Sequence, residues 1–293
     1  MSFFLEVLVG GLLAGVMYSL VALGFVLIYK TSGVLNFAQG AMVLFAALAF
    51  VTLTEHHVPF AVALLVTLAA MILLGWAIER FVLGPLVNAP PITLFMATLG
   101  LSYFIEGAAQ LAFGTETHEL NLGIPDEPLH VAGVSVSEFD LAAALIAGAL
   151  VAALTIFFRT TRTGLSFRAV ADDGLGALAT GLRLPQILTI VWALAGAVAL
   201  VAGLLWGSRL GVQFSLSLVV LKALPVLVLG GFDSIPGAIA GGLIIGAIEK
   251  LAEVYVGPFV GGGIESWIAY VAALAFLLVR PAGLFGQQRL ERA

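Results

Sequence analysis

Long runs of apolar residues, separated by short polar segments, dominate the hydropathy pattern of this chain. A helix needs roughly 17 to 25 apolar residues to cross the hydrocarbon core of a bilayer. Nine segments come close to this length or reach it, and most of them end at charged residues. They are residues 7–29, 34–54, 60–78, 92–113, 141–158, 186–206, 214–231, 236–255 and 264–279.

This pattern predicts an all-α fold, in which residues 1–293 form a single transmembrane domain built as a polytopic helical bundle. The expected number of spans is eight or nine. It is nine if every segment crosses the membrane. It is eight if residues 34–54 enter the bilayer and return to the same side, which also changes the side on which the N-terminus lies.

The distribution of basic residues predicts the orientation, because lysine and arginine are retained on the cytoplasmic side during insertion. With nine alternating spans, nine of the twelve basic residues fall on one side: Lys30, Arg80, Arg159, Arg162, Arg168, Arg183, Arg280, Arg289 and Arg292. The loop at residues 114–140 lies opposite and holds six acidic residues and no basic ones. We therefore expect an extracytoplasmic acidic loop, an N-terminus outside and a C-terminus in the cytoplasm.

Composition excludes a soluble enzyme. Charged residues make up 10% of the chain and hydrophobic residues 61%, whereas a soluble domain carries about 25% charged residues. The chain has no cysteine, no His-Glu-x-x-His arrangement and no Walker A sequence, so it is not expected to hydrolyse ATP itself. We predict no catalytic residues, no metal or cofactor site and no nucleic-acid partner. If the chain takes part in pumped transport, the energy must come from a partner protein or an ion gradient.

The segment at residues 159–185 is longer than a turn between two spans requires. It carries four arginines and two aspartates. Residues 165–180 are expected to form a short helix with Phe167, Ala171, Leu175 and Leu178 on one face. Two interpretations remain open: a helix that lies flat on the lipid surface, or a helix that docks into a groove of a cytoplasmic protein.

Ionisable residues inside apolar spans are costly and need compensation. Lys222 and Glu106 lie deepest in their segments, and Lys222 is expected either to reach the interface or to pair with Glu106 or Glu249. Asn36 and Gln39 either cap the following helix and satisfy backbone groups, or line a substrate path. The second alternative is open because irregular backbone is tolerated inside a membrane where it lies beside water. Asn36, Gln39, Glu106, Lys222 and Glu249 are therefore the candidate residues of a substrate pathway.

Glycines recur four residues apart in several spans, including Gly11 with Gly15 and Gly242 with Gly246. Small residues at this spacing let helix backbones approach closely in lipid. Ordinary helix packing is the simpler interpretation, and a functional seam between helices is the alternative.

The order and spacing of several short motifs resemble the LivH-like permease subunits of branched-chain amino acid ATP-binding cassette (ABC) importers. The resemblance extends over nearly the whole chain. It rests on GVLNFAQG at 33–40, WAIER at 76–80, RTTRTG at 159–164, RAVADD at 168–173, KALPVLVLGGFDSIPGA at 222–238 and RPAGLFG at 280–286.

This resemblance implies a permease subunit, not an enzyme, that moves branched-chain or other small apolar amino acids across a bacterial plasma (inner) membrane. The implied partners are a second homologous permease, two cytoplasmic ABC ATPases and an extracytoplasmic amino-acid-binding protein. The lipid bilayer surrounds the permease. The segment at 159–185 would be the cytoplasmic coupling element. Its coupling residues would be Arg162, Gly164, Arg168, Ala171, Asp172, Asp173 and Gly181.

Two alternatives stay open at this point. Urea and short-chain amide permeases share the same scaffold, so the cargo can be an amide instead of an amino acid. A stand-alone secondary transporter or channel would instead use Lys222, Glu106 or Glu249 as ion-coupling groups. The long basic loop favours the importer, because a gradient-driven carrier needs no docking site for an ATPase.

Overall fold

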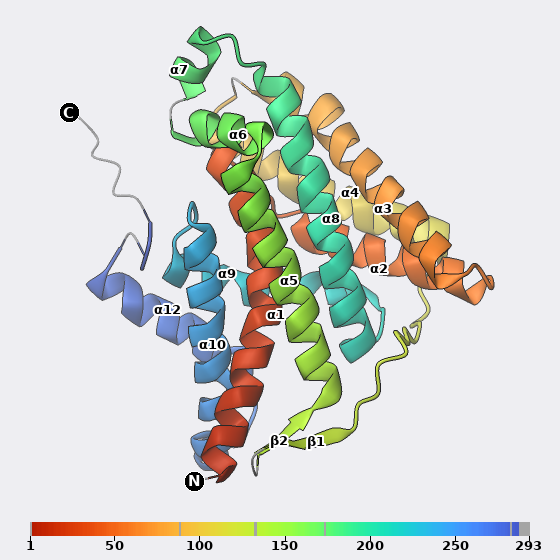
Figure 1. Cartoon of the computed structure of the whole chain (residues 1–293), viewed down its shortest axis with the longest axis vertical. Coiled ribbons are helices and arrows are strands. Elements are labelled where there is room, and N and C mark those ends of the chain that lie inside the picture. The colour runs from red at the N-terminus through yellow and green to blue at the C-terminus, as the bar shows by residue number, and fades with distance from the viewer. Residues whose placement is uncertain (1, 88, 132–133, 173, 282, 287–293) are drawn as a thin grey trace. The chain divides into compact units, whose positions relative to one another are not determined.

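The computed structural model describes residues 2–87, 89–131, 134–172, 174–281 and 283–286 (Figure 1). Helices follow one another along nearly all of this chain. In order the elements are α1 (Ser2–Ser32), α2 (Gln39–Glu55), α3 (Phe60–Ala77), the π-helix η1 (Ile78–Leu83), the 3-10 helix η2 (Gly84–Leu86), α4 (Pro91–Phe113), β1 (Pro128–Val131), β2 (Val134–Ser137), α5 (Glu138–Thr160), α6 (Arg162–Asp172), α7 (Gly174–Ala179), α8 (Leu184–Leu210), the 3-10 helix η3 (Phe214–Leu218), α9 (Val219–Gly230), α10 (Ile235–Tyr255), α11 (Gly257–Val260), the 3-10 helix η4 (Ile264–Ser266) and α12 (Ile268–Val279).

Each of the nine predicted apolar segments contains a helix. Within the described residues, six helical stretches are long and apolar enough to cross a membrane by length and composition: Phe3–Ser32, Phe60–Leu86, Pro91–Phe113, Glu138–Thr160, Leu184–Leu210 and Ile235–Tyr255. Three further apolar helices are shorter: Gln39–Glu55, Phe214–Gly230 and Ile268–Val279. The helical, polytopic character of the fold is confirmed, and the count of eight or nine crossings stays a prediction.

The three shorter helices correct the predicted segment bounds. The segment at 34–54 becomes helical only at Gln39, because the Asn36 side chain accepts a hydrogen bond from the Ala38 N–H and holds a local turn. The segments at 214–231 and 264–279 each begin with a 3-10 turn before their α-helix starts.

The chain divides into two compact units. The first contains Met1–Val26, Gly123–Ala149 and Leu221–Ala293, and the second contains Leu27–Leu122 and Leu150–Val220. The first unit therefore holds most of α1, the two strands, the beginning of α5 and nearly all of the chain from α9 onwards. The second holds α2, α3, α4, α6, α7 and α8.

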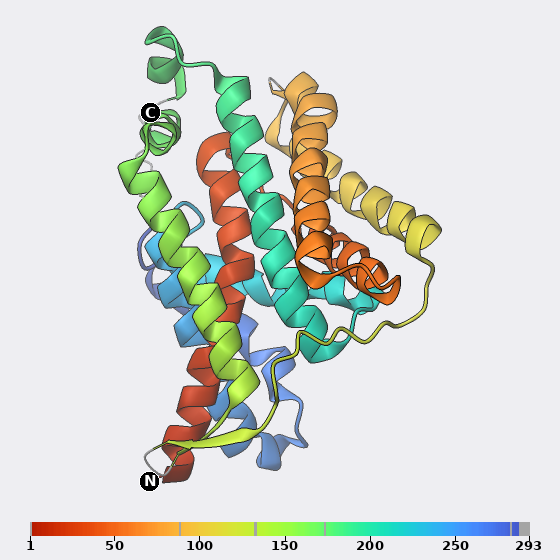
Figure 2. The same cartoon turned by 45° about the vertical axis from the view of Figure 1, so that its right-hand side comes forward.

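Helix α2 forms the core of the second unit. It packs against α3, α4, α8 and η3, and twelve of its seventeen residues are buried. A helix that is apolar on every side is suited to such a position, because it has no face that prefers water. Helix α3 runs alongside α8, as the orange and teal helices show in Figure 2.

Glycines bring α1 and α10 together in the first unit. A Cβ on Gly11 would lie 2.7 Å from the carbonyl oxygen of Gly246, and a Cβ on Gly15 would lie 2.9 Å from the Cα of Leu243. The two backbones are therefore in direct contact at these positions. The packing interpretation of the glycine spacing is confirmed for this pair of helices.

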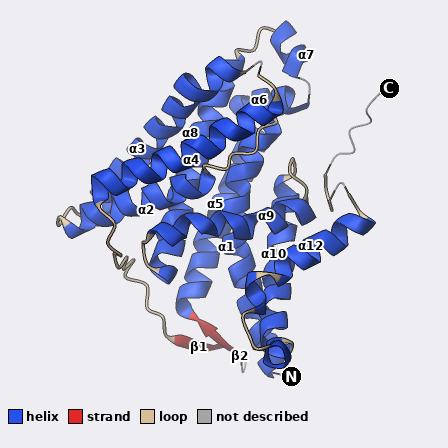
Figure 3. Ribbon diagram, turned by 180° about the vertical axis from the view of Figure 1, so that it is seen from behind, coloured by secondary structure: helices blue, strands red, loops and turns tan. Residues whose placement is uncertain are grey.

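A short hairpin interrupts the helical pattern. Strands β1 and β2 pair antiparallel, with Pro128 opposite Ser137, and appear in red in Figure 3. They lie inside the acidic loop predicted at residues 114–140. Within the described residues, these strands and an isolated antiparallel bridge between His118 and Val212 are the departures from an all-α fold.

Helices α3 and α4 expose large apolar side chains. Leu73 of α3 is 60% exposed, and Phe104 and Leu111 of α4 are 71% and 92% exposed. Exposed apolar surface of this kind is unfavourable in water and suits contact with lipid or with another membrane subunit.

Candidate functional site

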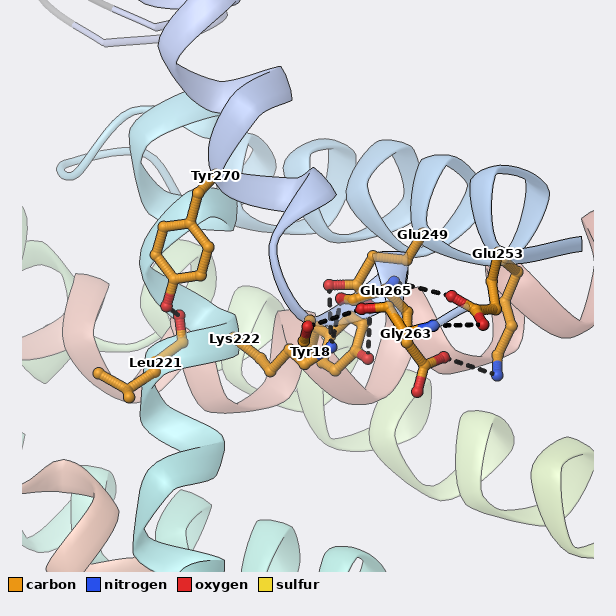
Figure 4. Close-up of polar contacts among 10 residues, drawn as sticks. Tyr18, Leu221, Lys222, Glu249, Glu253, Gly263, Glu265 and Tyr270 are labelled. Atoms are coloured by element: carbon orange, nitrogen blue, oxygen red, sulfur yellow. Dashed lines mark hydrogen bonds and ion pairs between the residues drawn. The ribbon is translucent and has the colours of Figure 1, made fainter. Parts of the chain in front are cut away.

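A buried ion pair forms the centre of a polar cluster in the first unit (Figure 4). Lys222 Nζ lies 3.3 Å from Glu249 Oε1, and the Tyr18 hydroxyl donates a hydrogen bond of 2.7 Å to Glu249 Oε2. The Glu249 side chain is 2% exposed, and the Lys222 side chain is 27% exposed. Three helices, α1, α9 and α10, each contribute one of these residues. The carboxylate thus has a cation and a hydroxyl as partners, as an intramembrane charge requires.

A proline in α9 explains a second contact of this cluster. Pro225 lies inside the helix and has no N–H to donate to the carbonyl of Leu221, four residues earlier. The hydroxyl of Tyr270, in α12, donates to this carbonyl at 2.8 Å instead (Figure 4). The hydroxyl therefore satisfies a backbone group that would otherwise lack a partner in a lipid environment.

A glycine-rich turn supplies the last polar partner of Lys222. The three glycines at 261–263 have positive φ angles, which lets the chain reverse after α11. Glu253 of α10 accepts hydrogen bonds from the backbone N–H groups of Gly263 at 2.9 Å and Glu265 at 3.0 Å. The turn held in this way presents the Glu265 carbonyl, which accepts from Lys222 Nζ at 2.7 Å.

A second ion pair lies at the edge of the cluster. Lys250 Nζ is 3.4 Å from Glu265 Oε2, and both side chains are more than a third exposed. An exposed pair of this kind contributes little to stability.

The pairing of Lys222 with Glu249, one of two expected from the sequence, is therefore confirmed. A role of this pair in a substrate pathway stays a prediction. Among the residues that the structure describes, no group of three or more histidine, aspartate or glutamate side chains is arranged to hold a metal ion.

Asn36 and Gln39 come together in the second unit and are wholly buried. Asn36 Nδ2 donates to Gln39 Oε1 at 3.2 Å, and Gln39 Nε2 donates to the carbonyl of Ala195 at 3.5 Å. With the bond to Ala38, these contacts show that both side chains satisfy backbone groups. The N-cap of α2 is Ala38, without a side-chain cap hydrogen bond, so neither Asn36 nor Gln39 caps this helix. Glu106 lies half-buried on α4 and, within the described part of the chain, has no hydrogen bond to either amide. The pathway role of all three residues stays a prediction.

The charged segment at 159–185 differs from the prediction in its helix bounds. One helix over residues 165–180 was expected, and the structure has α6 from Arg162 and α7 from Gly174. Helix α6 begins earlier because the Thr161 hydroxyl accepts a hydrogen bond from the Gly164 N–H at 3.0 Å. It ends at Asp172, next to aspartate and glycine, two residue types that disfavour a helix interior. Asp173 and the side chain of Leu175 lie outside the described residues.

Helix α6 has a packed face and an exposed charged face. Gly164, Phe167 and Val170 are buried, and the Phe167 ring lies 4.3 Å from the ring of Phe158 at the end of α5. The opposite face exposes four residues to the surroundings: Arg162, Leu165, Arg168 and Asp172.

The structure also describes three further residues predicted to take part in coupling, namely Gly164, Ala171 and Gly181. A Cβ on Gly164 would collide with the backbone of Phe158, so α6 approaches α5 closely there. Ala171 is half-buried, and Gly181 ends α7 with a φ of +87°. Leu178 was expected on the same face as Phe167, but it is 47% exposed whereas Phe167 is buried, because α7 is a separate helix and does not continue the face of α6.

Sequence reasoning missed Tyr18, Glu253, Glu265 and Tyr270 as members of the Lys222 cluster. Tyr18 and Tyr270 are isolated tyrosines in apolar runs and gave no periodic signal. Glu253 and Glu265 flank the three glycines at 261–263, and this arrangement was the one available indication of a turn tied back by a carboxylate.

Comparisons with known proteins match this chain to a family. The family model described as "Branched-chain amino acid transport system / permease component" matches residues 7–279. The chain is 28% identical over 305 residues to the high-affinity branched-chain amino acid transport system permease protein LivH of Escherichia coli (strain K12), with 99% of this chain and 98% of the relative covered. It is 28% identical over 311 residues to the corresponding protein BraD of Pseudomonas aeruginosa, with the same coverage.

The probable branched-chain amino acid transport permease protein LivH of Methanocaldococcus jannaschii is 27% identical over 294 residues, covering 96% of this chain and 92% of its own length.

Proposed function

Because this chain belongs to the family of branched-chain amino acid transport system permease components, we propose that it is the membrane-spanning subunit of an ABC importer. It translocates branched-chain or other small apolar amino acids between its helices, without covalent chemistry. The family match over residues 7–279 is the observation that carries this proposal. The named relatives, which align over nearly their full length, support the choice of cargo.

The energy source in this proposal is a pair of separate cytoplasmic ATPases. The sequence holds no Walker A motif, so the chain needs an external source of energy. The exposed face of α6, with Arg162, Leu165, Arg168 and Asp172, supports a docking role, because an apolar residue among mixed charges can both anchor and orient a partner.

The remaining partners follow from the same proposal. A second homologous permease completes the translocation path, and an extracytoplasmic binding protein delivers the amino acid. The chain is a multi-pass membrane protein, which we place in the bacterial inner membrane with its N-terminus outside and α6 in the cytoplasm. The excess of basic residues on the α6 side of the predicted topology supports this orientation.

Transport by reconstituted protein tests this function. Proteoliposomes that contain this chain, its partner permease, the ATPases and the binding protein are expected to accumulate leucine only with ATP present. Urea and acetamide should not compete for uptake. Leucine movement by this chain alone, down a gradient and without ATP, would contradict the importer and favour a stand-alone carrier. Competition by urea would identify the cargo as an amide.

Charge reversal on α6 tests the docking surface. The variants Arg168→Glu and Asp172→Lys are expected to lower ATP-driven leucine uptake by about tenfold or more. Each reversed side chain would then face a group of the same charge on the ATPase and be repelled by it. Both side chains are exposed, so the amount of folded protein in the membrane should stay unchanged. The matched control is Glu116→Lys in the acidic loop, which should leave retention of the ATPase intact. Normal uptake by both α6 variants would exclude this docking role.

A further inference from the structure

A cavity of about 220 Å³ lies within the second unit, and no residue of the Lys222 cluster is among the described residues that line it. Its wall is formed by the end of α1, the π-helix η1 and the turn η2, the beginning of α4 and the beginning of α8. The cavity is small beside the roughly 300–1,000 Å³ of pockets that hold drug-sized ligands. It therefore suits a ligand with only a few carbon atoms.

Among the described residues that line this cavity, Glu79 is the one that is ionisable. Its side chain is only 4% exposed. It lies in the π-helix at Ile78–Leu83, and such a turn changes the direction in which successive side chains point. The neighbouring Arg80 is exposed. Thus a residue that ends an apolar segment in the sequence is turned into the protein.

Within the described part of the chain, Glu79 has one side-chain partner. The Thr189 hydroxyl donates a hydrogen bond to Glu79 Oε2 at 2.8 Å. A buried carboxylate requires more compensation than one neutral hydrogen bond, because the cost of removing its charge from water is large. None of the described residues along the cavity wall is basic. A cation inside the cavity would supply this compensation.

The other polar groups of the wall are also suited to accept hydrogen bonds. Thr31 and Ser32 donate their hydroxyl protons to carbonyls of α1, at 3.1 Å to Leu27 and 2.7 Å to Ile28. The Ser32 oxygen also accepts a hydrogen bond from the Val34 N–H at 3.2 Å. A hydroxyl oxygen has two lone pairs, so each of the two oxygens can still accept a hydrogen bond from a ligand. The rest of the wall is mainly apolar and includes Leu94, Leu188 and the buried indole of Trp192. An acceptor-rich end and an apolar wall suit a ligand with a donor-rich cation on an aliphatic chain.

We propose that this cavity binds a primary ammonium group on a short branched aliphatic chain, with Glu79 as its counter-ion. A charge-assisted hydrogen bond between the ammonium and the carboxylate would provide most of the specificity. Both a free aliphatic amine and an amino acid such as leucine carry this group. The amino-acid source rests on the proposed transport function, whereas the amine source does not.

Ligand binding to the purified full-length chain tests this proposal without ATP or partner subunits. The probes are isopentylamine, leucine and the neutral isopentanol, and the signal is the part of the tryptophan fluorescence change that Trp192→Phe abolishes. Isopentylamine is expected to give a saturable change. Glu79→Gln should weaken its binding about tenfold or more and leave isopentanol unaffected. The control Glu55→Gln, in the same unit but outside the cavity wall, should bind like the parent.

Protection from chemical modification tests the same contact without a substitution. A hydrophobic carbodiimide should modify Glu79, and the bound ammonium should slow this reaction, as mass spectrometry of the labelled peptide would show. Binding of leucine with the same Glu79 dependence would make the transported amino acid a source of the ligand. Binding of isopentylamine alone would make free amines the source. Either result supports the site.

The proposal is wrong if neither amine nor leucine binds, if Glu79→Gln binds the ammonium as tightly as the parent, or if no ligand protects Glu79. Because ATP plays no part in these measurements, such a result would leave the uptake test of the transport function unaffected. Failure of ATP-driven leucine uptake would likewise leave the isopentylamine result intact.

Discussion

Replacing Lys222 with methionine is expected to lower the free energy of unfolding by about 3–5 kcal/mol, because it leaves a buried carboxylate without its cation. Glu249 is 2% exposed and has Tyr18 as its remaining side-chain partner in the cluster. Methionine keeps most of the volume of the lysine side chain, so the loss reports charge more than packing. Denaturation of the purified protein in detergent, followed by fluorescence, measures it.

The neighbouring ion pair provides the matched control. Lys250→Met removes a cation from the same cluster, but Lys250 and Glu265 are 37% and 45% exposed, so the expected loss is about 0–1 kcal/mol. The double variant Lys222→Met with Glu249→Gln should recover part of the stability, since no charge is then left unpaired. Equal losses for Lys222→Met and Lys250→Met would show that Lys222 only extends to the interface.

Replacing Gly15 with valine is expected to prevent α1 from packing on α10. A Cβ at this position would press on the carbonyl of Gly242 and lie 2.9 Å from the Cα of Leu243. Backbone atoms cannot move aside as a flexible side chain does, so the cost should exceed the roughly 1–3 kcal/mol of ordinary overpacking. Size-exclusion chromatography of detergent-solubilised protein should show little or no monodisperse material.

Gly10→Val is the control for this experiment. Gly10 lies in the same helix, and a Cβ there would meet nothing within 4 Å. This variant should elute like the parent and lose no thermal stability, because valine has a higher helix propensity than glycine. If Gly15→Val behaves in the same way, the close approach of α1 and α10 is not required for folding.

The helical elements of this fold follow largely from hydropathy. Each of the nine apolar segments contains a helix, because in lipid the backbone must satisfy its own hydrogen bonds. Helix α2 shows what hydropathy cannot give: its start at Gln39 depends on the turn that Asn36 holds by a side-chain bond to the Ala38 N–H. Hydropathy also misses the end of α6 at Asp172, because the helical spacing of apolar residues continues beyond this position in the sequence.

The partners within the polar cluster depend on tertiary contacts. Lys222 and Glu249 are 27 residues apart, and the sequence left the choice between Glu249 and Glu106 open. Tyr18 is 231 residues from Glu249, so no local pattern connects the two. In the sequence, Glu79 and Arg80 are the charged residues at which the apolar segment 60–78 ends. The structure places Glu79 in a π-helical turn and buries its side chain.

Labelling from each side of the membrane tests most directly that a separate ATPase acts on this permease through α6. The chain contains no cysteine, so Arg168→Cys introduces a unique, exposed thiol on α6. A membrane-impermeant maleimide should label it in inverted vesicles and not in intact cells, and bound ATPase should protect it. Glu116→Cys in the acidic loop should show the opposite sidedness. Labelling of Arg168→Cys from outside intact cells would contradict a cytoplasmic docking surface.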